Sequence, residues 1–359
     1  MTEACGAAAA FAHHLGPKDA KVAIVGDAWG KEDAKIGRPF NGYSGQMLGE
    51  LLADAGLRRR DCFLTTVFAR AAPPKVAGKH PFHAWQLTTK EARAAGTGGL
   101  PAMAKGRFLA PQFLPELDRL KAELTSVQPN IVIALGATAT WAMLGVTGLQ
   151  AVRGTCAKGL GGLKILPTHH PSSLLAEWDN RVVLVADLMK AERESHFPEL
   201  RRPQRVVTID PSLDDILAFA ARKHFVLGVD IETAGGQITC IGFAPSAGEA
   251  LVIPFVDKRK TSNSYWAAAW QEEKAWLVVR ELLAGPAAKV FQNGLFDMQW
   301  LAKAGCKILN VADDTMLLHH ALYPELPKGL GFLGSIYCNE ASWKLLRKHE
   351  GNQMNKREE

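Results

Sequence analysis

Four short apolar runs that alternate with amphipathic stretches constrain the fold of this chain more than any other feature. The runs lie at residues 22–26, 62–68, 130–136 and 163–168, and the helical patterns lie at 46–55, 113–127 and 138–144. Short apolar runs of this kind are typical of buried strands, and recurrence every three or four residues is typical of helices. We therefore predict an α/β unit with a parallel, helix-flanked sheet and a ligand site at the carboxyl ends of its strands.

The length of the chain predicts two domains. Its 359 residues exceed the span of about 100–200 residues that one domain usually takes. A polar, proline-punctuated stretch at 196–204 is the expected linker, between a first domain at 1–195 and a second at 205–359. The second domain shows strand patterns at 205–209, 225–231, 238–243, 250–254 and 289–292 and a helical pattern at 266–283.

One stretch of the first domain has no clear period. Residues 71–106 are rich in Pro, Gly, Lys and Ala, which predicts an exposed insertion.

Composition narrows the class of protein. Hydrophobic residues make up 47% and charged residues 22% of the chain, and no apolar run approaches the roughly 20 residues that cross a bilayer. We therefore expect a cytoplasmic protein without a membrane partner. The six cysteines form no close pairs, which predicts reduced thiols and no cysteine metal site. A net charge of +6 suits a polyanionic partner.

Chemistry-bearing residues follow the first strand. Asp27 lies at its end, and Phe40 lies on a glycine-punctuated loop beyond it. Gly42, Ser44 and Gly45 begin the next helical pattern, where exposed N–H groups are expected to hold a phosphate, while Phe40 stacks on a base.

Two motifs carry a family resemblance. Gly-Asp-Ala-Trp-Gly at 26–30 continues into Gly-Arg-Pro-Phe at 37–40, and His-His-Pro-Ser-Ser at 169–173 follows the last apolar run. Over roughly residues 20–195 the chain resembles the uracil-DNA glycosylase superfamily, nearest to its thermophile-type branch. The resemblance implies a three-layer glycosylase domain that acts on a base flipped out of DNA.

The resemblance also implies residue roles. Asp27 orients the attacking water, Phe40 stacks on the flipped base, and His170 stabilises charge on the carbonyl oxygen of the base. Pro171, Ser172 and Ser173 contact the DNA backbone.

The chain departs from the family pattern in three places. Thr66 stands where the family usually has an asparagine that reads the base, so the base removed stays open. Trp29 replaces a proline of the first motif. The cysteines that hold an iron–sulfur cluster in that branch have no counterparts near residues 69–72 or 110–111, so we predict no cluster and no glycosylase cofactor.

Structural roles are the alternatives for these residues. Phe40 is alternatively a core anchor of its loop, Asp27 a helix cap, and His170 an ordinary buried or surface histidine. A dinucleotide site is disfavoured because the chain lacks the Gly-x-Gly-x-x-Gly pattern.

The second domain carries clustered carboxylates. Asp230 and Glu232 alternate along an apolar run and share one face, and Asp297 follows a later strand. Oxygen ligands of this kind select Mg²⁺ or Mn²⁺. With Asn293 and Phe296 beside Asp297, residues 205–345 resemble the 3′–5′ exonuclease domain of family A DNA polymerases. The resemblance implies a ribonuclease-H-like fold and two metal ions that activate water and stabilise the leaving 3′ oxygen.

The last motif of that family, Tyr-x-x-x-Asp, is not found up to Glu359, so we expect weak or absent exonuclease activity and an incomplete domain. The favoured function is release of a base, with uracil first, by a DNA repair or replication protein whose partners are DNA and a DNA polymerase. One alternative is a non-catalytic module that binds single-stranded DNA or a polymerase. The other is an exonuclease with a DNA-gripping first domain.

Overall fold

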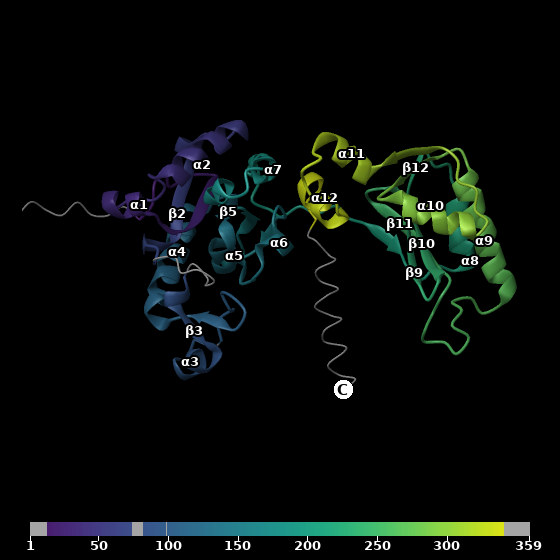
Figure 1. Ribbon diagram of the computed structural model, residues 1–359, viewed down its shortest axis with the longest axis horizontal. Helices are drawn as coiled ribbons and strands as arrows, with labels where there is room; N and C mark the ends of the chain where they lie inside the picture. Colours follow the sequence, from purple (N-terminus) through teal and green to yellow (C-terminus); the bar gives the residue numbers. More distant parts are fainter. Residues whose placement is uncertain (1–12, 74–81, 98, 341–359) are drawn as a thin grey trace, which may run out of the picture. The chain divides into compact units, whose positions relative to one another are not determined.

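A computed structural model describes residues 13–73, 82–97 and 99–340. Their contacts divide the chain into two compact units (Figure 1). Residues up to Arg201, together with those from Gly331 onward, form the first unit, and Arg202–Leu330 form the second. Within the described ranges, no helix has the length and apolar character needed to span a membrane.

The first unit contains a five-stranded sheet in the order β2-β1-β5-β7-β6. Its strands are β1 (Val22–Trp29), β2 (Cys62–Ala71), β5 (Ile131–Leu135), β6 (Ala157–Lys158) and β7 (Lys164–Thr168). The pairs β1–β2, β1–β5 and β5–β7 are parallel, and β6 is antiparallel to β7. The predicted parallel sheet is confirmed, and the carboxyl ends of four strands meet along one edge.

Both faces of this sheet are apolar, so helices cover both. Ala23 and Val25 of β1 face a cluster that includes α4 and α5, whereas Val22 and Ile24 face a cluster that includes α2 and α7. Apart from one helix in the insertion after β2 and one near the end of the described chain, the α-helices of this unit are α1 (Lys31–Ile36), α2 (Tyr43–Asp54), α4 (Leu114–Val127), α5 (Gly136–Leu144), α6 (Leu149–Val152) and α7 (Asn180–Glu194). The result is the three-layer arrangement that the sequence predicts.

The insertion after β2 differs from its prediction. Its described part contains β3 (Gln86–Thr88), α3 (Thr89–Ala94) and β4 (Arg107–Leu109), with β3 and β4 antiparallel. Phe82 and Trp85 are buried, and their rings lie 5.7 Å and 4.7 Å from that of Phe68. The expectation of an exposed, aperiodic segment is therefore wrong for these residues, because a few aromatic side chains fix it to the core. The predicted stretch at 74–81 lies outside the described residues.

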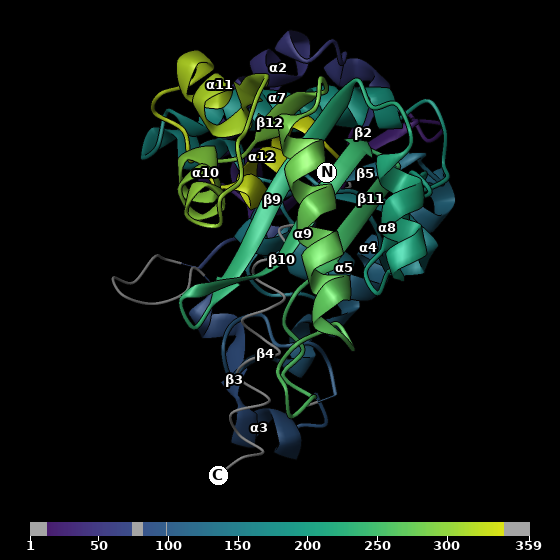
Figure 2. The same cartoon turned by 90° about the vertical axis from the view of Figure 1, so that its right-hand side faces the viewer.

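The second unit contains a six-stranded mixed sheet in the order β13-β12-β9-β10-β11-β8. The strands are β8 (Val206–Thr208), β9 (Val226–Ala234), β10 (Gln237–Ser246), β11 (Glu249–Pro254), β12 (Ala288–Phe291) and β13 (Val311–Asp314). The helices are α8 (Leu213–Ala220), α9 (Ala269–Ala284), α10 (Gly294–Lys303) and α11 (Thr315–Leu322). Figure 2 shows α8 and α9 crossing one face of this sheet, where Ile216 and Val279 join its core.

The chain returns to the first unit after Leu330. Helix α12 (Leu330–Tyr337) and the residues up to Glu340 pack with the first unit, although the sequence prediction assigned 205–359 to the second domain. By its contacts, the second unit is therefore inserted between two parts of the first. We call residues 331–340 the return segment.

Candidate functional site

Residues that the sequence selected meet at the strand ends of the first unit. Asp27 lies on β1 and Thr66 on β2, while His170 follows β7 by two residues. The register pairs Gly26 with Thr66 directly. The parallel sheet thus brings three separate motifs to one edge, as expected of such folds.

Gly136 is the point where Asp27 and His170 approach each other. This glycine begins α5 directly after β5 and has a φ of 90°. A Cβ atom on it would lie 2.9 Å from Oδ2 of Asp27 and 3.2 Å from Cβ of His170. Only a residue without a side chain fits between them, so the backbone of β5 and α5 fixes the spacing of the two groups.

The carboxylate of Asp27 caps the helix across the sheet. Its Oδ1 accepts a hydrogen bond of 2.9 Å from the backbone N–H of Ala139, in the first turn of α5. Burial raises the pKa of Asp27 to about 7, although N–H groups of Ala139 and Thr138 act in the opposite direction. Asp27 therefore changes its charge near neutral pH, and its capping role does not exclude a chemical one.

Phe40 lies against the other glycine of the first motif. A Cβ atom on Gly26 would lie 2.8 Å from Cζ of Phe40 and 3.4 Å from Cγ2 of Thr66. Phe40 is 6% exposed, belongs to the core cluster with α2, and has a φ of 57° that side-chain residues rarely adopt. Nη2 of Arg59 donates a 2.6 Å hydrogen bond to the carbonyl oxygen of Phe40 and holds this conformation.

The hydroxyl proton of Thr66 already takes part in a hydrogen bond within the chain. The residue is buried, and its Oγ1 donates a hydrogen bond of 3.1 Å to the carbonyl oxygen of Phe68. The hydroxyl therefore keeps acceptor capacity but no second donor, whereas an asparagine amide offers both.

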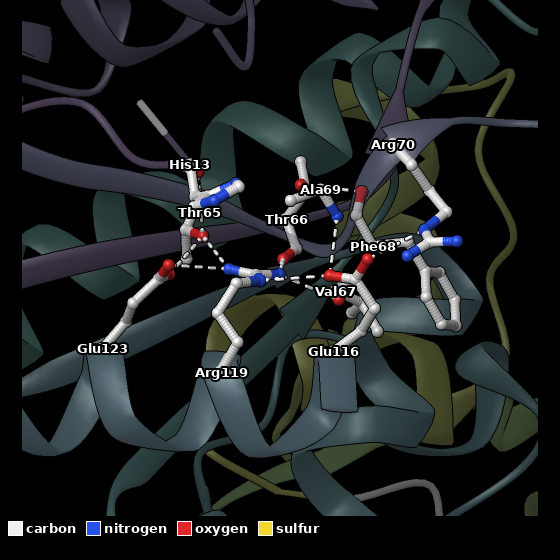
Figure 3. A network of polar contacts seen from close by, with 10 residues as sticks. All are labelled: His13, Thr65, Thr66, Val67, Phe68, Ala69, Arg70, Glu116, Arg119 and Glu123. Carbon is white, nitrogen blue, oxygen red and sulfur yellow. Dashed lines mark hydrogen bonds and ion pairs between the residues drawn. The ribbon is translucent and has the colours of Figure 1, made fainter. Parts of the chain in front are cut away.

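Charged side chains of α4 hold this end of β2 (Figure 3). Arg119 donates to the carbonyl oxygens of Thr66 at 2.6 Å and Val67 at 3.0 Å, and it pairs with Glu116 and Glu123. The carboxylate of Glu116 accepts from the backbone N–H of Ala69. Because these groups are largely shielded from water and paired, the middle of β2, which carries Thr66, is held firmly in place.

The predicted serines orient His170. Nδ1 of His170 accepts an N–H bond of 3.2 Å from Ser172 and lies 2.8 Å from its Oγ. Ser173 donates its hydroxyl to the carbonyl oxygen of His170 at 2.8 Å, and Pro171 is buried in the same turn, η5 (Pro171–Leu175). A ring whose Nδ1 accepts an N–H carries its proton on Nε2, so His170 is prepared to donate from Nε2.

The expected phosphate turn differs from its prediction. Backbone N–H groups of Asn41, Gly42 and Gly30 donate to the carboxylate of Asp33, at 2.6, 3.3 and 3.0 Å. The N–H of Gly45 donates to Gly42, and a Cβ atom on Gly45 would lie 1.9 Å from the carbonyl oxygen of Phe40. The backbone N–H groups of Asn41 and Gly42 therefore bind the carboxylate of Asp33 and not a phosphate. Gly45 is needed because the backbone of Phe40 packs closely against it. Ser44 lies in the first turn of α2.

The carboxylates of the second unit are less tightly organised. Asp230 and Glu232 are exposed on β9, while Asp297 is buried on α10 and accepts the N–H of Ile231 at 3.0 Å. Burial, then the nearby carboxylates of Asp230 and Asp314, raise the pKa of Asp297 to about 6. Among the described residues, no three His, Cys, Asp or Glu side chains are gathered into a set that could hold a metal ion. The predicted three-carboxylate set is therefore not gathered among the described residues.

The second predicted motif is organised around Asp314. Its carboxylate accepts the N–H groups of Asn293 at 3.0 Å and Gly294 at 2.7 Å, at the start of α10. Phe296 is 45% exposed on the same helix. Asp314 therefore fixes the turn that presents Asp297 and Phe296.

The iron–sulfur cluster implied by the resemblance does not fit the residues present. Where that branch has cysteines, Arg70 at the end of β2 pairs with Glu116 at 2.8 Å and lies over the ring of Phe113. The thiols of Cys62 and Cys156 are buried, and burial raises the pKa of both to about 12, so neither is ready to ligate iron. The absence of a cluster remains a prediction, and the described residues offer no four-cysteine set.

Sequence reasoning missed three residues of this site. Gly136 follows an apolar run directly, which is a usable signal for a close approach. Asp33 lies three residues after Gly30, a spacing typical of a carboxylate that satisfies a helix start. Arg59 acts on Phe40 and Gly45 from a distant loop, and no local pattern indicates it.

Comparisons with known proteins give a family for the first half of the chain. The family model described as the uracil DNA glycosylase superfamily matches residues 13–197. The type-4 uracil-DNA glycosylase of Thermotoga maritima is 33% identical over 181 residues, which cover 49% of this chain and 79% of the relative. The type-4 enzyme of Archaeoglobus fulgidus is 25% identical over 194 residues, 52% of this chain and 78% of the relative.

The second half matches a different family model, described as 3′–5′ exonuclease, over residues 204–357. A structure of Brucella melitensis NrnC with bound Mg²⁺ is 22% identical and covers 37% of this chain and 61% of that one, with a TM-score of 0.26, too low to carry a structural argument. The first half is thus that of a DNA-repair hydrolase, and the second half is an exonuclease-type domain. From its matched length and its identity to the Thermotoga maritima enzyme, the chain belongs to the uracil DNA glycosylase superfamily.

Proposed function

We propose that the first unit hydrolyses the N-glycosidic bond of a base flipped out of DNA, with uracil as the base. The approach of Asp27 and His170 across Gly136 carries this proposal. A carboxylate and a histidine side chain that start from neighbouring positions supply the two kinds of group that the reaction needs. The sugar gains positive charge as the bond breaks, and the departing base gains negative charge.

Asp27 supplies the negative charge. Its raised pKa of about 7 means that it is largely ionised above neutral pH. In that form it stabilises the oxocarbenium-like sugar and orients the water that attacks it. The N–H of Ala139 on Oδ1 keeps the carboxylate in one orientation.

His170 acts on the base. With Nδ1 occupied by Ser172, its Nε2–H donates to a carbonyl oxygen of the base and stabilises the charge that develops there. His169 beside it is buried, and burial together with the guanidinium of Arg153 lowers the pKa of His169 to about 4. His169 is therefore uncharged at neutral pH and adds no competing cation.

Phe40 and Thr66 form the base-binding side. We assign stacking to the ring of Phe40 beside Gly26. Since Oγ1 of Thr66 donates to Phe68, it contacts the base only as an acceptor, which suits an N–H such as that at N3 of uracil. One contact in place of two predicts weaker discrimination between bases than an asparagine would give.

DNA binding is assigned to the surface around these residues. Ser44, in the first turn of α2, and Pro171, Ser172 and Ser173 in η5 are the proposed backbone contacts. Gly42 and Gly45 shape the turn before α2, because their own N–H groups are already bonded within the chain. Leu175 and Trp178, 68% and 60% exposed at the end of η5 and beyond it, add apolar side chains able to enter a base stack.

The second unit is proposed to be a metal-dependent 3′–5′ exonuclease domain of weak activity. Asp230, Glu232 and Asp297 are the proposed ligands of Mg²⁺ or Mn²⁺, which would activate water for phosphodiester cleavage. Asn293 and Phe296 belong to the same proposed site. The neighbouring anions that raise the pKa of Asp297 support this donor set, because a divalent cation would relieve their repulsion. A DNA polymerase is the proposed protein partner.

One assay separates these functions. The whole protein is incubated with uracil-containing and normal oligonucleotides, with and without EDTA, and the products are examined for alkali-labile abasic sites and for ladders. Abasic sites that survive EDTA support the glycosylase. EDTA-sensitive ladders without abasic sites support an exonuclease with a DNA-gripping first unit, and intact DNA throughout supports a non-catalytic binding module.

The variant Asp27→Asn sharpens that assay. It is expected to lose base release while its affinity for uracil-containing DNA stays within about twofold, because the amide keeps the shape but not the charge. Unchanged turnover would remove Asp27 from the mechanism.

A further inference from the structure

The return segment lies against a buried charged cluster of the first unit. Arg153, Asp187 and Lys190 are 3%, 0% and 4% exposed. Nη1 of Arg153 lies 2.9 Å from both carboxylate oxygens of Asp187. Two cations and one anion in a site shielded from water need further acceptors, because an unpaired buried charge is costly.

The return segment supplies those acceptors. Nζ of Lys190 donates to the carbonyl oxygens of Ser335 and Cys338 at 2.6 Å each, and to that of Gly154 at 2.5 Å. The guanidinium of Arg153 donates to Oγ of Ser335. Two of the three bonds of the lysine therefore end on the return segment.

The backbone beside the cluster is shaped for the same contact. Oδ1 of Asn339 accepts the N–H of Cys156 at 2.8 Å, and Oγ1 of Thr155 donates to the carbonyl oxygen of Glu340 at 2.8 Å. A Cβ atom on Gly154, whose φ is 72°, would lie 2.6 Å from Oδ1 of Asp187 and 2.8 Å from the carbonyl oxygen of Ser335. A glycine is thus required where the segment meets the cluster.

The cluster also reaches the histidine turn. Oδ2 of Asp187 accepts the hydroxyl of Thr168 at 2.6 Å, and the N–H of Gly154 donates to the carbonyl oxygen of Pro167 at 2.8 Å. Thr168 is the last residue of β7 and directly precedes His169 and His170. A chain of short contacts therefore runs from Ser335 through Arg153 and Asp187 to the turn that carries His170.

We propose that the return segment is a working part of the glycosylase, which completes the Arg153–Asp187–Lys190 cluster and thereby positions His170 for base release. The inference rests on the proposed glycosylase function. Arg153, Asp187, Lys190 and Ser335 are positioning residues, because none of them is assigned a contact with the substrate. The exonuclease family model matches residues 204–357 and so includes the return segment. By its contacts, however, the return segment belongs to the first unit.

The test uses the whole protein with the double variant Ser335→Ala/Asn339→Ala and the single variant Lys190→Met. Arg193→Met on the exposed side of α7 is the matched control. Single-turnover base release, KM for uracil-containing DNA, thermal unfolding and hydrogen exchange of residues 164–173 are measured for each. We expect the turnover of folded enzyme to fall about 10- to 100-fold with KM within about twofold, since small displacements near a reacting centre are costly. Exchange at Thr168–His170 should accelerate, and Arg193→Met should behave like the wild type.

One outcome would overturn the positioning role of the return segment, and a different one would overturn the glycosylase assignment. If the variants unfold at lower temperature but keep wild-type turnover per folded molecule and wild-type exchange at Thr168–His170, the segment is only a structural support and the proposal fails. If the wild type releases no base, the glycosylase assignment fails. In that case amide hydrogen exchange is the remaining test of the return segment. Faster exchange at Thr168–His170 in the double variant would support a role of the segment in positioning this turn, and unchanged exchange would refute it.

Discussion

The two candidate sites hold their charged groups in different ways. In the first unit, the carboxylate of Asp27 and the Cβ atom of His170 both lie beside Gly136, with Asp27 bonded to Ala139 and His170 bonded to Ser172. In the second unit, burial first and the nearby carboxylates of Asp230 and Asp314 second raise the pKa of Asp297. The groups of the first site are thus fixed by hydrogen bonds within the fold, whereas the buried carboxyl of the second site lies among like charges.

The largest effect is expected from filling the gap of the first site. Gly136→Ala places a methyl group 2.9 Å from the carboxylate of Asp27, and base release should fall about 100-fold or more. Single-turnover kinetics provide the measurement. Gly161→Ala is the control, because Gly161 also has a positive φ, of 63°, but no atom lies within 4 Å of its added Cβ. Equal losses in both variants would show that backbone strain, not the gap, is responsible.

The second effect concerns stability and pH. The folded pKa of Asp27 is raised above its unfolded value, so its contribution to stability is full below pH 4 and is lost as the pH rises through about 7. Asp27→Asn removes this loss and should raise the free energy of unfolding at pH 8 by about 2 kcal/mol, after allowance for partial exposure, and by nearly nothing at pH 4.

His169 also changes the stability with pH, so the test must compare the free energy of unfolding of Asp27→Asn with that of the wild type at each pH. Its pKa is lowered to about 4, so its contribution is present above pH 6.5 and is lost as the pH falls, in the sense opposite to that of Asp27. Denaturant unfolding of both proteins is measured at pH 4, 6 and 8. The contribution of His169 is the same in both and cancels when the two free energies of unfolding are subtracted. A difference that does not grow with pH would contradict the pKa of Asp27.

A third effect tests how firmly the fold holds the base-binding strand. Arg119→Met removes the bonds to the carbonyl oxygens of Thr66 and Val67, and turnover should fall about tenfold through displacement of Thr66. Arg70→Met also removes a partner of Glu116 but no contact with Thr66, so it should retain most activity. Similar losses in both would assign the effect to Glu116.

The smallest effect should separate the two sites most clearly. Mn²⁺ at a few times its dissociation constant should stabilise the protein by about 1 kcal/mol, through the second unit alone. Thermal unfolding with and without Mn²⁺ measures this, and Asp297→Asn should abolish it while exposed Asp214→Asn leaves it intact. Persistence of the shift in Asp297→Asn would place metal binding elsewhere.

Much of the first unit could be predicted because its strands are apolar on both faces. The runs that become β1, β2, β5 and β7 have no competing interpretation, and polar residues at their ends are natural site candidates. The sequence carries local signals for Gly136 and Asp33, but not their partners, because those depend on the register of neighbouring strands and on competition for backbone N–H groups. Phe82 and Trp85 were hidden in a stretch whose composition is typical of exposed loops.

The return segment has a consequence for biosynthesis. The ribosome makes the part of the first unit up to Arg201 before the return segment, yet the buried Lys190 in that part receives two of its carbonyl partners from Ser335 and Cys338. At roughly 5–20 residues per second, the nascent first unit must wait on the order of ten seconds while the intervening second unit emerges. A chaperone that shields incomplete chains would therefore have its longest contact with this first unit, and pausing of translation before Gly331 would lengthen that interval.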